Sequence, residues 1–253
     1  MIKEILKPFV YLLRKKYKLV ITRDMMYLGR ERLADIYNSM DYVRIGTLEL
    51  LAYEIRSNNV LGSTAEVGVY RGDFAKYINL LFSDRKLYLF DTFEGFPEIH
   101  AKLDAEKGFS SGEQDWSGTS VEAVILKMPY PNNVTIKKGI FPETAKGVND
   151  RFCFVSLDVD LYEPTKEGLK FFYPLLSPGG VIMVHDFNNF GYKGVREAVL
   201  EFCREKCISY VPIPDIGGTV IITKNWSDKE WIIILWMRLK KVFQNQSKLS
   251  KIY

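Results

Sequence analysis

Residues 152–164 read FCFVSLDVDLYEP, an apolar run that ends in two carboxylates with one residue between them. The run from Phe152 to Leu157 is typical of a strand buried on both faces, as in parallel sheets that are covered by helices. Because alternate residues of an extended chain point to the same side, we expect Asp158 and Asp160 on one side of the chain. The stretch therefore predicts an α/β fold with polar chemistry at a strand end.

Strand-like runs recur along the chain, and amphipathic segments typical of helices separate them, which predicts a mostly parallel sheet with helices on both faces. The last two runs are joined by PDIGG, a turn sequence that predicts an antiparallel hairpin. A seven-stranded sheet that ends in this hairpin is the result. The expected strands are Thr64–Val69, Lys86–Asp91, Val134–Lys138, Phe152–Asp158, Val181–His185, Ser209–Ile213 and Thr219–Thr223.

The composition is that of a soluble globular protein, with 47% hydrophobic and 26% charged residues in 253. The net charge of +4 is mild and concentrated near the two ends, so we expect no nucleic-acid partner. The three cysteines form neither an even framework nor a CxxC pair, which indicates a reducing cytoplasm.

The domain organisation that we predict has three parts. Residues 1–60 form an N-terminal helical extension, 61–224 the main α/β domain, and 225–253 a basic amphipathic helix. The C-terminal segment Asp228–Phe243 could lie on an anionic membrane surface, at the inner face of the membrane. We favour packing on the core or on a second subunit of a homo-oligomer, and its apolar run Trp231–Met237 is too short to span a bilayer.

The first strand-to-helix turn carries Glu66, Gly68 and Gly72, and the next strand ends in Asp91. Glycines let the backbone approach a ligand, but the GxGxxG spacing that a dinucleotide needs is missing. An acid before the glycines suits a cationic ligand, and Asp91 is placed to accept ribose hydroxyls. S-adenosylmethionine, which has an ammonium, a sulfonium and a ribose, suits both acids.

Asp158, Asp160 and Asp186 are expected to converge at neighbouring strand ends. Carboxylates this close repel one another unless a cation or protons lie among them, and oxygen ligands suit magnesium, manganese or calcium. The alternative is that these acids cap helices or pair with basic residues, for which the candidates are Lys166, Lys193 and Arg196.

Seven motifs together resemble the macrocin O-methyltransferase family, whose members methylate sugar hydroxyls with S-adenosylmethionine and magnesium. The resemblance covers about Thr64 to Phe202 and implies a Rossmann-like class I methyltransferase fold; the pairing of DTFEGFP with LDVDLYEPT is its most specific part. The motifs are AEVGVYRGDFA, LFDTFEGFP, WSGTSVEAV, KKGIFPET, SLDVDLYEPT, LLSPGGVIMVHDF and GVREAVLEF.

The resemblance implies roles for individual residues. Asp158 and Asp186 fall on metal-ligand positions for Mg²⁺ or Mn²⁺, and Asp160 falls where some members carry the general base. Members commonly have two adjacent acids where this chain has His185 and Asp186, so the third ligand is His185, Asn188 or water. His185 is also a catalytic candidate, and the alternative is a histidine at a strand end whose ring is satisfied by a neighbouring residue. The segment Pro97–Thr119 matches a mobile lid. The implied cofactor-binding residues are Glu66, Gly68, Tyr70, Gly72, Asp91 and Thr92.

These residues predict a metal-assisted O-methyltransferase that acts on a sugar or nucleotide-sugar. A divalent cation stabilises the alkoxide of a sugar hydroxyl, and Asp160 accepts its proton. Two other interpretations stay open: a catechol or other small vicinal diol as acceptor, and a nucleoside-binding module without catalysis.

Overall fold

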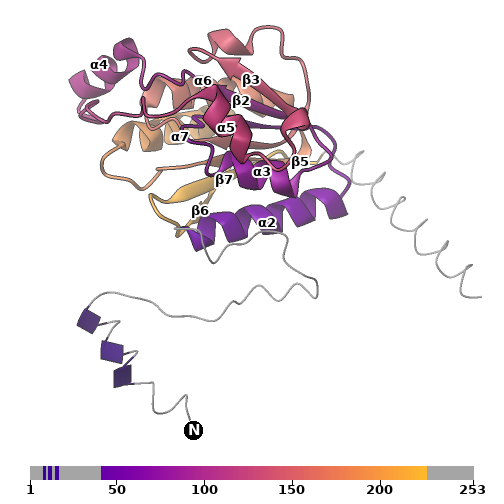
Figure 1. Cartoon of the computed structure of the whole chain (residues 1–253). Helices are drawn as coiled ribbons and strands as arrows, with labels where there is room; N and C mark the ends of the chain where they lie inside the picture. Colours follow the sequence, from indigo (N-terminus) through magenta and orange to yellow (C-terminus); the bar gives the residue numbers. More distant parts are fainter. Residues whose placement is uncertain (1–7, 10, 13–14, 17–40, 227–253) are drawn as a thin grey trace, which may run out of the picture. The chain divides into compact units, whose positions relative to one another are not determined.

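A computed structural model describes residues 8–9, 11–12, 15–16 and 41–226 of the chain. The chain divides into two units, Met1–Arg32 and Leu33–Tyr253, and the sheet with its helices belongs to the second. Its centre is a seven-stranded sheet of order β3-β2-β1-β4-β5-β7-β6, parallel except for β7, which runs antiparallel to both β5 and β6 (Figure 1). The predicted sheet and terminal hairpin are confirmed. The strands are β1 (Ser63–Val67), β2 (Leu87–Asp91), β3 (Val134–Lys138), β4 (Phe152–Leu157), β5 (Leu176–Val184), β6 (Val211–Ile213) and β7 (Thr219–Thr223).

Helices cover both faces of the sheet (Figure 1). Residues of α2, α3 and α5 share one buried apolar cluster with the sheet, and residues of α6 and α7 share the other. The helix α4 lies apart from these layers and contacts α6. The helices are α2 (Tyr42–Ser57), α3 (Ala75–Leu81), α4 (Glu98–Glu106), α5 (Val121–Lys127), α6 (Tyr162–Leu175) and α7 (Lys193–Lys206), with 3-10 turns at Pro131–Asn133 and Glu143–Ala145.

Alternation along the strands sends side chains to both layers, as a buried parallel sheet requires. In β2, Leu87 and Leu89 face the α2–α3 layer, whereas Tyr88 and Phe90 face the α6–α7 layer. All six residues of β4 are buried, which confirms that this run is covered on both faces.

The strand β5 begins at Leu176 rather than at the predicted Val181. The intervening SPGG predicts a turn, but Leu176 pairs with Phe152 and a register shift follows before Phe154 pairs with Val181. Tertiary pairing therefore extends the strand through residues that favour a bend.

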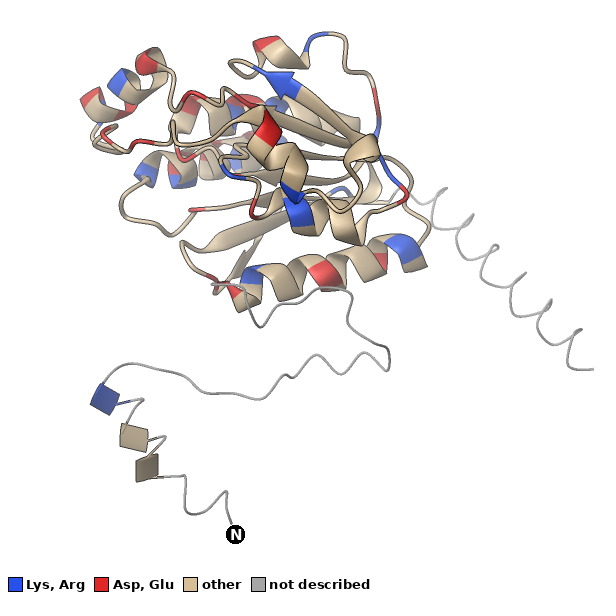
Figure 2. Ribbon diagram, in the orientation of Figure 1, with Lys and Arg blue, Asp and Glu red and all other residues tan. Residues whose placement is uncertain are grey.

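The terminal segments are largely outside the described residues, including the predicted C-terminal helix and most of the predicted helical extension before α2. Within the described part, α2 lies in the predicted helical extension and packs Ile45, Leu48 and Ile55 into the α2–α3 layer. Acidic and basic segments are interspersed over the described helices (Figure 2). None of the described helices has the length and apolar character needed to cross a membrane.

Candidate active site

Three neighbouring strands bring the candidate acids together at their carboxyl ends. The amide of Asp158 donates to the carbonyl of Val67 on β1 (2.9 Å), and the amide of His185 donates to that of Leu157 on β4 (2.9 Å). This pairing aligns the residues that follow β1, β4 and β5 along one rim, where ligands bind in open α/β sheets. A cavity of about 490 Å³ opens at the rim.

The turn after β1 approaches β4 too closely for any side chain. Gly68 has φ of +81°, and a Cβ there would lie 1.9 Å from the carbonyl oxygen of Asp158. Its amide donates to the carbonyl of Phe90. Glycine at this position therefore keeps the cavity floor open and the strand ends in contact.

Asp91 braces the loops around the predicted cofactor pocket. One of its carboxylate oxygens accepts from the amides of Val69 (2.6 Å) and Tyr70 (2.9 Å), and the other accepts from the amide of Phe93 (2.6 Å). The hydroxyl of Thr92 donates to the carbonyl of Gly95 (2.6 Å). Asp91 and Thr92 both line the cavity. The Asp91 oxygen that accepts from Phe93 alone can accept a further hydrogen bond from a ligand hydroxyl.

Asp158 is held between two cations. Its Oδ2 lies 2.9 Å from a terminal nitrogen of Arg44, and its Oδ1 lies 3.1 Å from Nδ1 of His185. The same Nδ1 lies 2.8 Å from Oδ2 of Asp186. None of the basic residues proposed as alternatives makes these contacts: Lys166 pairs with Glu201, for example.

The pKa values follow from these contacts. Burial opposes ionisation of Asp158, but Arg44 and His185 outweigh it and hold the pKa of the carboxyl below its usual value. Burial likewise opposes the charge on His185, yet Asp158 and Asp186 raise its pKa to about 10. The ring is therefore an imidazolium at neutral pH.

Asp160 behaves differently from its neighbour. Burial, the charge of Asp158 and a hydrogen bond to Asp186 raise the pKa of Asp160 well above its usual value. Its backbone is left-handed, with φ of 62°, and Asp186 has φ of 58°. Such conformations cost free energy and are concentrated at functional sites.

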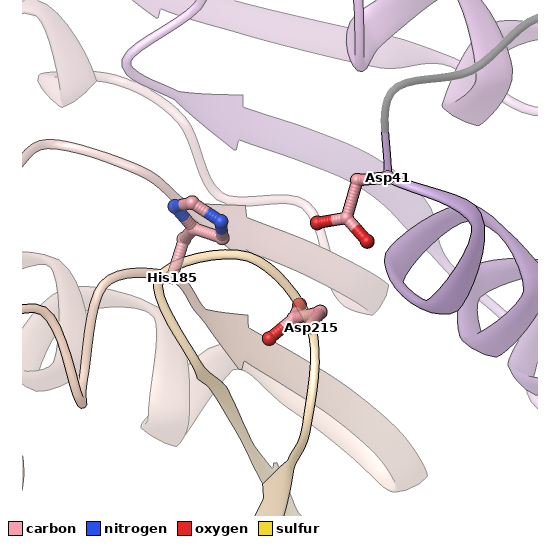
Figure 3. A group of neighbouring side chains, drawn as sticks. All are labelled: Asp41, His185 and Asp215. Carbon is pink, nitrogen blue, oxygen red and sulfur yellow. The ribbon is translucent and has the colours of Figure 1, made fainter. Parts of the chain in front are cut away.

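His185 has carboxylates on more than one side. Besides Asp158 and Asp186, it lies beside Asp41 at the start of α2 and Asp215 in the turn before β7, with one ligand atom of each of these three residues within 4.8 Å of the others (Figure 3). Asp41 also accepts from the amides of Arg44 and Ile216, which ties α2 to that turn.

The donor set fits a divalent cation. Asp158, His185 and Asp186 each offer a ligand atom within 4.8 Å of the others. Neighbouring carboxylates repel one another, and the proton on His185 supplies part of the positive charge that offsets this repulsion. A metal ion that binds to the imidazole displaces this proton. The side chain of Asn188 instead accepts from Arg196 (2.9 Å), and Asn189 donates to Asp186 (2.7 Å).

The predicted lid contributes residues to the cavity. His100 on α4 and Trp116 line it, and so does Phe96, the residue directly before the lid. The ring of Trp116 packs edge-on against Tyr70 at 5.0 Å between centroids. The lid therefore contacts the turn that carries the predicted cofactor residues.

All sequence-predicted site residues except Gly72 and Asn188 line this one cavity. Four further residues line the cavity that the sequence did not single out for the site: Arg44, Asn189, Tyr192 and the lid aromatic Trp116. Arg44 carried no signal, because it is one of several basic residues in a helical segment. Asn189 directly follows Asn188, one of the predicted alternatives for the third metal ligand. Which of the two side chains faces Asp186 depends on the backbone turn.

The fold and the strand-end site define a Rossmann-like class I methyltransferase. The structure is similar to that of the O-methyltransferase NovP, with a TM-score of 0.60, 23% identity and coverage of 73% of this chain and 81% of that one. It is also similar to CalS11, a calicheamicin methyltransferase, with a TM-score of 0.58, 19% identity and coverage of 73% and 79%.

Sequence comparison adds the family. The macrocin O-methyltransferase (TylF) family model matches residues 23–224, and the chain belongs to this family. A relative from Streptomyces olivaceus, 8-demethyl-8-(2,3-dimethoxy-alpha-L-rhamnosyl)-tetracenomycin-C 4'-O-methyltransferase, is 27% identical over 218 residues, 80% of each chain. Mycinamicin III 3''-O-methyltransferase of Micromonospora griseorubida is 29% identical over 173 residues, 63% of this chain and 67% of the relative. The protein is therefore an O-methyltransferase, and its fold implies S-adenosylmethionine as methyl donor.

Proposed function

We propose that this protein transfers the methyl group of S-adenosylmethionine to a hydroxyl of a sugar, either nucleotide-activated or part of a glycan or glycoside. The observation that carries the proposal is the convergence of Asp158, Asp160 and Asp186 on one cavity beside the cofactor turn. The relatives, whose names specify rhamnosyl tetracenomycin and mycinamicin as substrates, support a sugar acceptor.

Asp160 acts as the general base in this proposal. The raised pKa of Asp160 makes its carboxylate a stronger proton acceptor than an ordinary aspartate. Cationic groups nearby would favour the ionised form, which can then accept the proton of the sugar hydroxyl. While it is protonated, Asp160 donates a hydrogen bond to Asp186, which holds the carboxyl in place until its proton is lost. The methyl-donor residues are those of the first two strand ends, with Glu66, Gly68 and Asp91 foremost.

Asp158 and Asp186 would hold the divalent cation, with His185 as third ligand after it loses its proton. When bound, Mg²⁺ or Mn²⁺ supplies Lewis acidity that lowers the pKa of a sugar hydroxyl. Asn189 orients Asp186 through its 2.7 Å hydrogen bond, and Arg44 orients Asp158.

The test is methyl transfer from labelled S-adenosylmethionine to a panel of nucleotide-sugars, free glycosides and catechols. We expect label in one sugar class and none in the catechols. Label in the catechols alone would show that the acceptor is a small vicinal diol and not a sugar. Absence of cofactor binding in calorimetry would leave a module without catalysis and overturn the proposal.

Metal dependence has its own test. Exhaustive chelation should abolish turnover, and added Mg²⁺ or Mn²⁺ should restore it. Because the cation displaces a proton from His185, its apparent affinity should rise with pH from about 6 to about 9, as titration calorimetry would measure. Full turnover after chelation would contradict the cation's role.

Cellular placement and assembly are also part of the proposal. We propose a cytoplasmic protein with the domain boundaries given above, whose C-terminal helix packs on the core or on a second subunit of a homo-oligomer, with the inner membrane face as the alternative. Gel filtration and vesicle flotation of the full chain distinguish the two.

A further inference from the structure

The turn between β6 and β7, residues 214–218, lies directly against two of the candidate cation ligands. Gly217 in this turn has φ of +81°, and a Cβ there would lie 2.4 Å from Oδ1 of Asp186 and 3.1 Å from Cε1 of His185. Only a residue without a side chain allows so close an approach of the backbone. The β6–β7 turn therefore closes one side of the candidate cation site, although none of the strand-end motifs includes it.

This contact limits where the carboxylate of Asp186 can lie. The residue is 6% exposed, and its Oδ1 accepts from the side-chain amide of Asn189 (2.7 Å) while Gly217 bounds it on another side. The other oxygen, Oδ2, lies 2.8 Å from Nδ1 of His185. With Oδ1 held between Asn189 and the turn, Oδ2 is directed toward the cation site. Neighbours of this kind orient metal-binding carboxylates in proteins.

The β6–β7 turn is itself fixed from two directions. Within the hairpin, the carboxylate of Asp215 accepts from the amide and the hydroxyl of Thr219. From α2, the carboxylate of Asp41 accepts from the amide of Ile216 (3.2 Å). Asp41 and Asp215 also lie beside the ring of His185 (Figure 3). The turn cannot withdraw from the cation site without breaking these hydrogen bonds.

We propose that the β6–β7 turn positions the cation ligands, with Gly217 as the positioning residue that admits the turn against Asp186 and His185. The proposal rests on the cation site of the proposed function. Gly218 has the same left-handed backbone, with φ of +75°, but a Cβ there would meet the side chain of Asn188 at 2.7 Å. Asn188 is exposed and has room to move, whereas Asp186 is buried.

The test compares Gly217→Ala with Gly218→Ala. Both variants place an alanine in a left-handed conformation and should lose similar backbone stability, but only Gly217→Ala displaces the carboxylate of Asp186. Titration calorimetry with Mn²⁺ should show affinity reduced roughly 10- to 100-fold in Gly217→Ala and less than about threefold in Gly218→Ala. Affinity for S-adenosylhomocysteine should change less than about threefold in both, because the proposed donor residues follow β1 and β2.

Equal affinity of the two variants for Mn²⁺ would overturn the inference and leave Gly217 a residue that only the turn backbone requires. Weaker binding of Mn²⁺ in Gly218→Ala alone would also overturn it, and would indicate Asn188 as the third ligand. Loss of S-adenosylhomocysteine binding together with Mn²⁺ binding in Gly217→Ala would show general disruption of the fold and contradict a positioning role.

If Gly217→Ala does not fold, hydrogen exchange in the wild-type protein gives the answer. Saturating Mg²⁺ should slow exchange of the amides of Asn188, Ile216 and Thr219, which make the hydrogen bonds within and across the turn. The amide of Gly139, which bonds to Asp91, is the control and should not change. Unchanged exchange in the turn would overturn the inference. Wild-type protein that binds no divalent cation would instead overturn the cation's role in the proposed function, which separates the two failures.

Discussion

At the scale of residues, identical side chains acquire different properties from their surroundings. Asp158 faces Arg44 and His185, which lower its pKa, whereas Asp160 faces other acids, which raise its pKa together with burial. The first is suited to hold a cation and the second to exchange a proton.

The two acids should respond differently to the same substitution. Asp160→Asn should lower kcat by roughly 10²- to 10⁴-fold, about 3 to 5 kcal/mol of barrier, with cofactor and metal affinity nearly unchanged. Because the pKa of Asp160 is raised, the wild-type rate should increase with pH as this group ionises, and the variant should lose that phase. Raised pH should still recover part of the variant's rate through ionisation of the acceptor. pH–rate profiles measure both.

Asp158→Asn should instead weaken metal binding, so that added magnesium or manganese restores part of the rate. Metal titrations of both variants make the comparison. Rescue of Asp160→Asn by excess metal, or normal metal affinity in Asp158→Asn, would show that the roles are assigned wrongly.

Gly68 is a second residue whose environment decides the outcome. Gly68→Ala places a Cβ 1.9 Å from a backbone oxygen in a left-handed conformation, and should cost roughly 3 kcal/mol or more of unfolding free energy. Gly108→Ala is the control and should cost about 1 kcal/mol, since Gly108 also has positive φ but a Cβ there would meet nothing within 4 Å. Urea unfolding measures the difference; equal costs would refute the steric account.

At the scale of elements, α4 is attached to α6 by one carboxylate. Asp104 is buried, and both its oxygens lie 3.2 Å from the amide of Tyr162, the first residue of α6. Phe109 packs on the ring of Tyr162, and its carbonyl accepts from the amide of Lys193. The predicted lid is thus held to the helices beside the acids.

This attachment should depend on pH. Burial, opposed by the Tyr162 hydrogen bond, raises the pKa of Asp104 to about 6. The folded state therefore binds more protons than the unfolded state between about pH 4 and 6, and the contribution of Asp104 to stability falls as pH rises through that window. Asp104→Asn should become more stable relative to wild type by roughly 1 to 3 kcal/mol between about pH 4 and pH 7.

Urea unfolding at about pH 4, 5.5 and 7 measures that difference, and hydrogen exchange in residues 98–106 localises it. The control is Glu106→Gln in the exposed last turn of α4, which should show no such trend. A constant difference between Asp104→Asn and wild type across pH would contradict the assignment.

At the scale of the whole molecule, an aromatic cluster joins α6 to the sheet. The ring of Phe172 contacts Phe90 on β2, Phe152 on β4 and Phe141, at centroid distances of 5.9, 5.0 and 5.8 Å. Its side chain is fully buried. The cluster holds α6 against the sheet, and it thereby positions the loop between β4 and α6 that carries Asp158 and Asp160.

Phe172→Ala should reduce the unfolding free energy by about 3 to 5 kcal/mol, because it removes buried surface and leaves a cavity. Phe190→Ala, at a side chain that is 89% exposed, should change it by less than about 0.5 kcal/mol. Chemical denaturation of both variants provides the measurement. Similar costs would mean that the cluster does not determine stability.

The sheet, its terminal hairpin and the rim on which the acids lie could all be predicted from the sequence. Local signals suffice for these features, because apolar runs mark buried strands and residues after parallel strands share one edge. The departure at β5 shows the limit, since SPGG favours a turn until Phe152 pairs with Leu176 across the sheet.

The groups that surround each acid, in contrast, depend on how the chain packs in three dimensions. Arg44 reaches Asp158 across more than a hundred residues, His185 meets carboxylates from four different segments, and Asp104 caps a helix that starts at Tyr162. Charge and burial act through space and depend on distances of a few ångströms. Spacing along the chain does not encode those distances, so the pKa values and the partners of Arg44 emerge only when the helices pack on the sheet.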